Sequence, residues 1–168
     1  RVVSGNDRDR REEGPLMAHE PRRVEVSRVA LTRPMRAALR AFVRDQAVAW
    51  VAVFGSRARA EARPDSDADV AVGLVRSLDR GARSALLGRL ETAWRGAGVE
   101  LDLLLVDGAG LVIRYVVASD GILVAARDPL DWARFRESAI VEYLDELPVL
   151  RFHEEALRQR IRDGTFAR

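Results

Sequence analysis

Three short runs of mainly aliphatic residues limit most strongly what this chain can fold into. They cover residues 47–54 (AVAWVAVF), 68–75 (ADVAVGLV) and 99–106 (VELDLLLV). Runs of this length and composition are typical of buried strands and are too short for buried helices. Segments with the apolar spacing of helices lie before the first run, between the second and the third, and after the third. Strands that alternate with helices predict an α/β fold.

The spacing of apolar residues also predicts where the first helices begin and end. Thr32 is a suitable N-cap for a helix that has Pro34 in its first turn. A second helix is expected to begin at Ser77 and to end at the Gly-Ala-Gly stretch 96–98, because glycine is common just beyond a helix.

A length of 168 residues favours one compact domain rather than two. Residues 1–31 mix both signs of charge with Gly, Pro and Ser, and we expect them to form a flexible N-terminal arm. Residues 32–168 are expected to form the domain, and about residues 129–164 have the apolar spacing of C-terminal helices. Pro148 is expected to bend or break this stretch, so that a second helix follows it.

The composition excludes several classes of function. Cysteine is absent, which excludes disulfides, thiolate catalysis and cysteine-bound zinc, and a reducing cytoplasm is the expected compartment. No apolar run is long enough to cross a bilayer, so we expect no membrane association. The net charge is only +2 and the arginines form no continuous basic stripe, so direct binding of nucleic acid is not expected.

Three aspartates in and beside the strand runs indicate a metal site. Asp67 and Asp69 are two residues apart at the start of the second run, so their side chains project from the same face of a strand. Asp102 lies between leucines in the third run, where an aspartate is costly to bury unless it is paired or bound to metal. Oxygen ligands without histidine or cysteine select magnesium or manganese. Three carboxylates on adjacent strands can hold two metal ions about 3.5–4 Å apart, an arrangement that catalyses displacement at phosphorus.

A glycine-serine turn follows the first run and could bind phosphate. Gly55 would let a ligand approach the backbone closely, and the Ser56 hydroxyl could donate to a phosphate oxygen. Without the aspartates, a plain strand-to-helix turn would be the better interpretation of this pair. Arg57, Arg59 and Arg63 place positive charge nearby, or else form a solvated face that pairs with neighbouring acids. Arg59 is our candidate for a contact with phosphate.

The order of Gly-Ser, a spacer, Asp-x-Asp and a later strand aspartate resembles the signature of the nucleotidyltransferase superfamily that includes the palm of DNA polymerase beta. The short length, the wording GSRAR…PDSDAD and the stretch FRESAIVEYLDELPVLRFHEEALRQRIRDG are similar to the minimal nucleotidyltransferases, particularly the MntA-like antitoxins paired with HEPN toxins. The resemblance covers about residues 34–164 and implies a palm-like mixed sheet flanked by helices, with a C-terminal helical tail. It also implies a helix at residues 108–121, where the β-branched residues alone favour a strand, and we expect a short strand at 122–126 after it.

The resemblance implies roles for the site residues as well. Asp67 would bridge two magnesium ions, Asp69 and Asp102 would complete their coordination, and Ser56 would hold the terminal phosphates of the nucleotide. One departure from the family pattern is Ala60, because glycine usually follows the Ala-Arg of the motif. If φ is positive at this position, alanine costs about 1–2 kcal/mol, so either the turn differs or activity is reduced.

The implied activity is magnesium-dependent transfer of AMP from ATP to a hydroxyl, with release of pyrophosphate. In MntA-like systems the acceptor would be a tyrosine of the cognate HEPN toxin, so this chain would be an antitoxin, and a homo- or hetero-oligomer is compatible with that role. One alternative is transfer to a small molecule such as an aminoglycoside, which usually requires an added substrate-binding domain. Another is a catalytically weak antitoxin that acts by binding alone, through its C-terminal helices.

Overall fold

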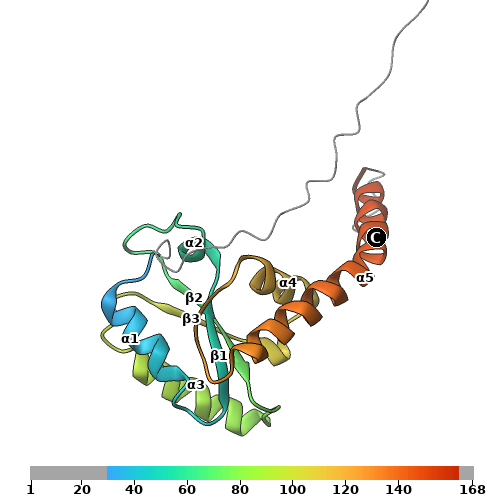
Figure 1. Cartoon of the computed structure of the whole chain (residues 1–168). Coiled ribbons are helices and arrows are strands. Elements are labelled where there is room, and N and C mark those ends of the chain that lie inside the picture. The colour runs from blue at the N-terminus through green and yellow to red at the C-terminus, as the bar shows by residue number, and fades with distance from the viewer. Residues whose placement is uncertain (1–29, 163–168) are drawn as a thin grey trace, which may run out of the picture.

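A four-stranded mixed sheet lies at the centre of the structure, a computed structural model that describes residues 30–162 (Figure 1). The strands are β1 (Val48–Val53), β2 (Ala68–Leu74), β3 (Leu101–Leu105) and β4 (Ile122–Ala126). Their order in the sheet is β3-β2-β1-β4. β1 pairs antiparallel with β2 and β4, whereas β2 and β3 are parallel. The expected mixed sheet is therefore confirmed, while the expected N-terminal arm, except for residues 30–31, lies outside the described residues.

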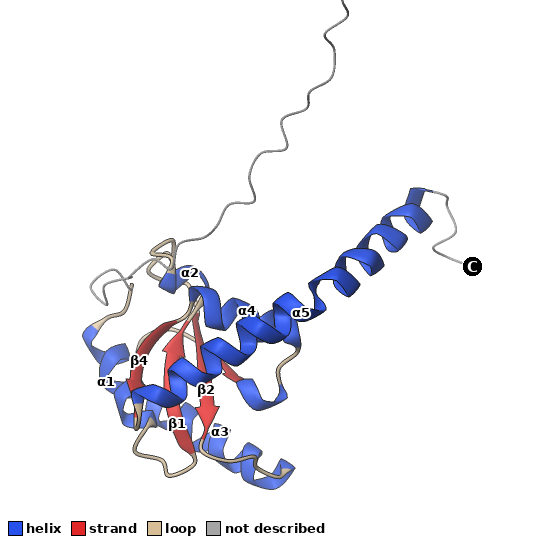
Figure 2. Cartoon of the chain, turned by 45° about the vertical axis from the view of Figure 1, so that its right-hand side comes forward, coloured by secondary structure: helices blue, strands red, loops and turns tan. Residues whose placement is uncertain are grey.

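Helices cover both faces of this sheet (Figure 2). They are α1 (Arg33–Phe42), α2 (Gly55–Ala58), α3 (Arg80–Trp94), α4 (Leu111–Asp120) and α5 (Pro129–Arg162), with a 3-10 turn, η2 (Val106–Gly108), after β3. α1 and α3 pack on one face, and α4 and α5 pack on the other. α2 is a single turn that directly follows β1. α4 confirms the helix that the family resemblance implied for residues 108–121.

The two faces of the sheet bury different kinds of side chain. The face under α1 and α3 is mainly aliphatic, and its fully buried residues include Leu39, Val51, Val72 and Leu86. The face under α4 and α5 is centred on Trp50, whose ring centroid lies 4.8 Å from that of Trp132 and 4.7 Å from that of Phe135. Each pair of helices is therefore held to the sheet by its own apolar cluster.

Side-chain caps fix the beginnings of α1 and α3. Thr32 caps α1 as predicted, and its hydroxyl accepts a hydrogen bond from the amide of Met35 at 3.4 Å. The predicted beginning of the next helix at Ser77 is wrong, because α3 begins at Arg80. Asp79 provides the cap there, and its carboxylate accepts from the amide of Ala82 at 2.8 Å. Aspartate is as good an N-cap as serine, so the sequence alone did not separate the two.

α5 is one helix of 34 residues that continues through Pro148, so the break that was considered there does not occur. Figure 1 shows that the helix changes direction between its orange and its red part, as the alternative of a bend implies. Proline lacks an N–H group, so the carbonyl of Leu144 loses its helical donor. Because Leu144 is exposed, water can bond to that carbonyl and the helix can continue. The C-terminal part of α5 extends away from the sheet (Figures 1 and 2). Within residues 30–162, none of the helices has both the length and the apolar character needed to cross a membrane.

Candidate functional site

Asp69 and Asp102 lie side by side on the parallel strands β2 and β3. The two residues are Cα partners in the register of this pair. Residues that pair in this way present their side chains to the same face, here the face covered by α4 and α5, which Ala71 and Leu104 share further along the strands. Asp69 is half-buried and Asp102 is exposed, and Asp67 is exposed just before β2 begins. The fold thus places all three predicted aspartates at the same end of two adjacent strands.

Gly55, the first residue of α2, fits against the carboxylate of Asp69. Its φ is +65°, a left-handed conformation that favours glycine. A Cβ atom at this position would lie 2.2 Å from Oδ2 of Asp69. No other residue type can therefore occupy this position unless the carboxylate moves. Gly55 makes room for Asp69, a role that its place in the sequence does not indicate.

The electrostatic environment of Asp69 reflects its burial and its acidic neighbours. Burial raises the pKa of the Asp69 carboxyl above its usual range, and the negative charges of Asp102 and Asp67 raise this pKa further. The positive charge of Arg59 acts in the opposite direction. The three aspartates therefore form one electrostatically coupled group, in which a cation would relieve the mutual repulsion.

The side chains of this group stand apart rather than forming a finished metal site. Between residues 30 and 162, no three acidic or histidine side chains are gathered closely enough to hold a metal ion as they stand. The donor set nevertheless fits magnesium or manganese, because it consists of hard carboxylate oxygens without sulfur or imidazole. Neighbouring strands are about 4.8 Å apart, a spacing that the paired carboxylates of Asp69 and Asp102 can bridge through a cation.

The single turn α2 ends in a Schellman motif with Ala60 in the left-handed conformation. The amide of Glu61 donates to the carbonyl of Ser56 at 2.9 Å, and the amide of Ala60 donates to the carbonyl of Arg57 at 3.4 Å. Ala60 has a φ of +59°. The chain therefore keeps the left-handed turn at the position where glycine was expected, at a strain cost of about 1–2 kcal/mol. For this alanine, either an altered turn or reduced activity was expected. The structure shows that the turn is not altered.

Arg59 lies beside the aspartates, and Ser56 is half-buried in α2. Nε of Arg59 donates to Oε2 of Glu61 at 2.9 Å, and its Nη1 lies 4.0 Å from Oδ2 of Asp120. Asp120, at the end of α4, was not among the predicted site residues. The approach of Asp120 to Arg59 depends on how α4 packs against the sheet, and no local pattern in the sequence indicates this contact.

Arg57 differs most from the expectation that the arginines after the turn either lie near a phosphate or form a solvated face. It is only 3 % exposed. Its guanidinium donates to backbone carbonyls instead of facing solvent. This burial depends on how residues 63–67 fold over α2, which a local pattern in the sequence does not reveal.

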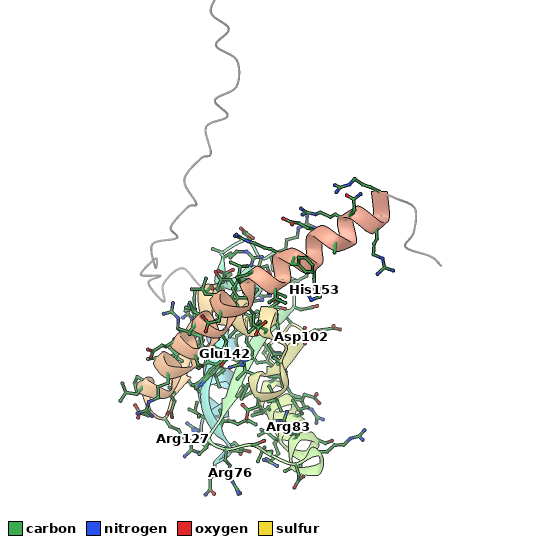
Figure 3. The ribbon with its side chains drawn as sticks, turned by 90° about the vertical axis from the view of Figure 1, so that its right-hand side faces the viewer. Arg76, Arg83, Asp102, Arg127, Glu142 and His153 are labelled. Atoms are coloured by element: carbon green, nitrogen blue, oxygen red, sulfur yellow. The ribbon has the colours of Figure 1, made fainter. Side chains whose placement is uncertain are left out.

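The aspartate group lies at an open edge of the molecule. β3 is an edge strand, and both Asp67 and Asp102 are exposed. Two hollows lie at the other end of β1 and β2, one beside Arg76 and one beside Gly73. Figure 3 shows Asp102 on the side toward which α5 extends, with Arg76 at the opposite end. A ligand bound to the aspartates would therefore remain accessible to a second molecule.

Comparisons with known proteins match this geometry. The model of the family described as Polymerase beta, Nucleotidyltransferase matches residues 38–130, which is more than half of the chain and contains the glycine-serine turn and all three aspartates. None of the curated proteins matches the sequence.

Solved structures with similar folds include chains of toxin-antitoxin complexes. A chain of a toxin-antitoxin complex with AMP-PNP is 25 % identical, with a TM-score of 0.53 over 79 % of this chain and 98 % of that chain. A chain of an MntA toxin-antitoxin mutant, in which two aspartates two positions apart are changed to glutamate, is also 25 % identical, with a TM-score of 0.50 over 76 % and 94 %. A protein from Shewanella oneidensis is 23 % identical, with a TM-score of 0.50 over 81 % and 100 %, and shows the similarity of fold alone.

Proposed function

This chain belongs to the Polymerase beta nucleotidyltransferase family, and from that premise we propose that it uses magnesium to transfer AMP from ATP to a tyrosine hydroxyl of a HEPN-type toxin, and so acts as an antitoxin. The observation that carries the proposal is the pairing of Asp69 with Asp102 in the register of β2 and β3, with Gly55 fitted against Asp69. A charge-coupled carboxylate group at an open edge suits transfer to a large acceptor.

In the proposed reaction, the acceptor hydroxyl oxygen forms a bond to the α-phosphorus of ATP. The bond between this phosphorus and the bridging oxygen breaks, pyrophosphate leaves, and the hydroxyl proton passes to water. Asp67, Asp69 and Asp102 would hold magnesium, which when bound supplies the positive charge that activates the attacking oxygen and neutralises the leaving group. Asp102, exposed on the edge strand, lies on the side from which a hydroxyl can approach.

Ser56 and Arg59 are the proposed contacts of the triphosphate. The Ser56 hydroxyl can donate to a phosphate oxygen, and Arg59 offers a charged guanidinium beside the aspartates. The present partners of Arg59 are Glu61 and Asp120, and all three side chains are about half exposed or more. Exposed pairs of this kind contribute at most about 1 kcal/mol, so a triphosphate can compete for the guanidinium.

α5 offers a surface for the protein that receives AMP. Its exposed apolar side chains include Val141, Leu144, Val149, Phe152 and Ile161. A set of this kind on a helix that projects from the domain (Figure 2) is typical of a helix that docks on a protein. Similarity to a chain of a toxin-antitoxin complex with AMP-PNP, at 25 % identity and a TM-score of 0.53, supports a toxin as the partner. Docking on α5 would hold the acceptor tyrosine near the open site and supply the proximity that the site itself lacks.

The proposal is tested by mixing this protein with Mg-ATP and the HEPN protein encoded beside it, if one is present, and measuring intact masses. Additions of whole AMP units to a tyrosine of the partner are expected, and Asp67→Asn should abolish them. Phe152→Glu should slow transfer to the partner without weakening the binding of Mg-AMP-PNP, because Phe152 is 69 % exposed on α5. Val75→Glu is the matched control, since Val75 is 57 % exposed at the opposite end of the sheet.

Two results would reject this function in favour of its rivals. An unmodified partner together with rapid AMP transfer to an aminoglycoside would identify a small-molecule transferase. An unmodified partner that is neutralised equally well by the wild type and by Asp67→Asn would identify an antitoxin that acts by binding alone.

A further inference from the structure

Arg57 is the one charged side chain, among the residues that the structure describes, that is almost completely buried. It lies in α2, two residues after Gly55, and it is 3 % exposed. A buried guanidinium is costly unless most of its donors are satisfied. The partners of these donors therefore show what the surrounding backbone must do in the folded state.

All the described acceptors of Arg57 are backbone carbonyls, and they belong to two separate segments. Nε donates to the carbonyl of Asp67 at 3.1 Å, and Nη1 donates to the carbonyl of Ala30 at 2.8 Å. Nη2 donates to the carbonyl of Pro64 at 3.4 Å and also to that of Ser66. In return, the amide of Ala30 donates to the carbonyl of Arg57 at 3.2 Å. One side chain thus joins α2, the segment that precedes α1, and the loop that leads into β2.

The loop that Arg57 holds has little structure of its own. It runs from Arg59 to Asp67, and its tip is a turn in which the amide of Ser66 donates to the carbonyl of Arg63 at 3.1 Å. The Ser66 hydroxyl accepts from the amide of Arg63 at 3.0 Å. Most of its residues are exposed, so few apolar contacts fix the path of the loop. The carbonyl of Asp67 is held directly by Arg57, at the residue where this loop becomes the aspartate group.

We propose that Arg57 is a positioning residue, which fixes the backbone at Asp67 so that Asp67 and Asp69 present their carboxylates to metal at the correct separation. This role rests on the proposed function, because that function assigns these aspartates to metal. A partner one shell beyond a metal ligand typically changes metal affinity by about 10–100-fold when it is replaced. The planar fork of arginine matters here, since Arg57 donates from three separate nitrogens, whereas a lysine carries all of its donors on one nitrogen.

The chain contains a matched control for this role. Arg127 also donates to backbone carbonyls, from Nε to Val48 at 2.8 Å and from Nη2 to Asp45 at 2.8 Å. Val48 is the first residue of β1, so Arg127 lies at the end of the sheet away from the aspartates. Its replacement should test what the loss of arginine–carbonyl bonds does to stability alone.

The experiment compares Arg57→Lys and Arg57→Met with Arg127→Lys in the full chain. Binding of AMP-PNP is measured by calorimetry across a range of magnesium concentrations, unfolding is followed in urea, and AMP transfer is measured at saturating partner. We expect Arg57→Lys to weaken magnesium-dependent binding of AMP-PNP by about 10-fold or more and to raise the magnesium needed for half-maximal transfer. Arg127→Lys should lower the urea midpoint without changing either magnesium dependence.

A folded Arg57→Lys variant with wild-type magnesium dependence would overturn the proposal, since Arg57 would then act on stability alone, as Arg127 does. If Arg57→Met does not fold, Arg57→Lys decides the question. If the wild type binds Mg-AMP-PNP but transfers no AMP, the proposed function fails. The magnesium dependence of AMP-PNP binding still tests the positioning role of Arg57. A wild type that binds no AMP-PNP with magnesium would overturn both.

Discussion

The two ends of the β1–β2 pair use the same local arrangement, a glycine that makes room for a large side chain across the strands. Near the aspartates, a Cβ atom at Gly55 would lie 2.2 Å from Oδ2 of Asp69. At the other end, a Cβ atom at Gly73 would lie 2.1 Å from Cε2 of Trp50, its partner in the register. Both side chains lie on the face covered by α4 and α5.

The groups that these glycines accommodate have opposite effects on folding. Trp50 is 3 % exposed and packs against two other aromatic rings, so its burial stabilises the fold. Asp69 is half-buried beside two other carboxylates, and its raised pKa shows that its charged form opposes folding. One end of the strand pair therefore supports stability, while the other holds a destabilising group that is the proposed metal ligand. Substitutions at the two ends should separate these roles.

Asp69→Asn is expected to have the largest effect on activity. Loss of the proposed metal ligand should lower the rate of AMP transfer by about 10³-fold or more, which corresponds to about 4 kcal/mol. The free energy of unfolding should stay the same or rise at pH 7 without metal, because asparagine removes a charge that opposes folding. Since the pKa of Asp69 is raised in the folded state, this gain should shrink as the pH falls through that raised pKa, and it should be lost below about 4, where the wild-type carboxyl becomes protonated in both states. Transfer assays and thermal melts at pH 7 and pH 3.5 measure both effects, and wild-type transfer rates would contradict the assignment.

Gly55→Ala should also act mainly on activity. The added Cβ must displace the carboxylate of Asp69, and a displacement of about 1 Å can cost about 10²-fold in rate. The positive φ adds a loss of about 1–2 kcal/mol in stability. Transfer per folded molecule, with the folded fraction taken from urea titration, is the measurement. Full activity in this variant would show that Asp69 does not need the position that Gly55 leaves open.

Gly73→Ala should show the opposite pattern, with lost stability and unchanged transfer per folded molecule. Forcing a methyl group against the Trp50 indole overpacks the core and should cost about 1–3 kcal/mol, or about 2–4 °C in melting temperature for each kcal/mol. Gly88→Ala is the control, because a Cβ there meets nothing within 4 Å inside α3 and should raise stability by about 0.5–1 kcal/mol. If Gly73→Ala abolished transfer while remaining folded, the two ends would not be separable.

Ala60→Gly should have the smallest effect. Glycine removes about 1–2 kcal/mol of strain at a φ of +59°, but it also makes the unfolded chain more flexible, which offsets about 0.4–1 kcal/mol of this gain. A net rise in melting temperature of a few degrees is expected, with transfer equal to or above that of the wild type. A clear fall in melting temperature would mean that Ala60 does not occupy the left-handed turn in solution.

The features that the sequence predicted correctly are those that depend on local patterns of residues. The strands follow from short aliphatic runs, the cap at Thr32 follows from a hydroxyl before an apolar periodicity, and the places of Asp69 and Asp102 within strands follow from the runs that contain them. The helix at α4 is the exception, since its β-branched residues favour a strand and only the family resemblance indicated a helix.

The features that were missed depend on contacts between distant parts of the chain. The burial of Arg57 needs a loop folded over α2, and the ion pair of Arg59 with Asp120 needs α4 packed against the sheet. In the sequence, Gly73 is an ordinary strand residue, and only the fold shows that Trp50 lies across it. The register that pairs Asp69 with Asp102 likewise follows from parallel pairing of two strands, which no single stretch of sequence specifies.

A bend at the proline within α5 would change the position of the C-terminal end of this helix. From Pro148 to Arg162 the helix rises about 21 Å, at about 1.5 Å per residue. Proline is one of the few causes of helix kinks sharper than about 20°, and a change of that size at Pro148 would move the far end by about 7 Å while leaving the sheet in place. If a protein docks on this part of α5 as proposed, its distance and angle from the aspartates would therefore depend on Pro148, which is an exposed residue.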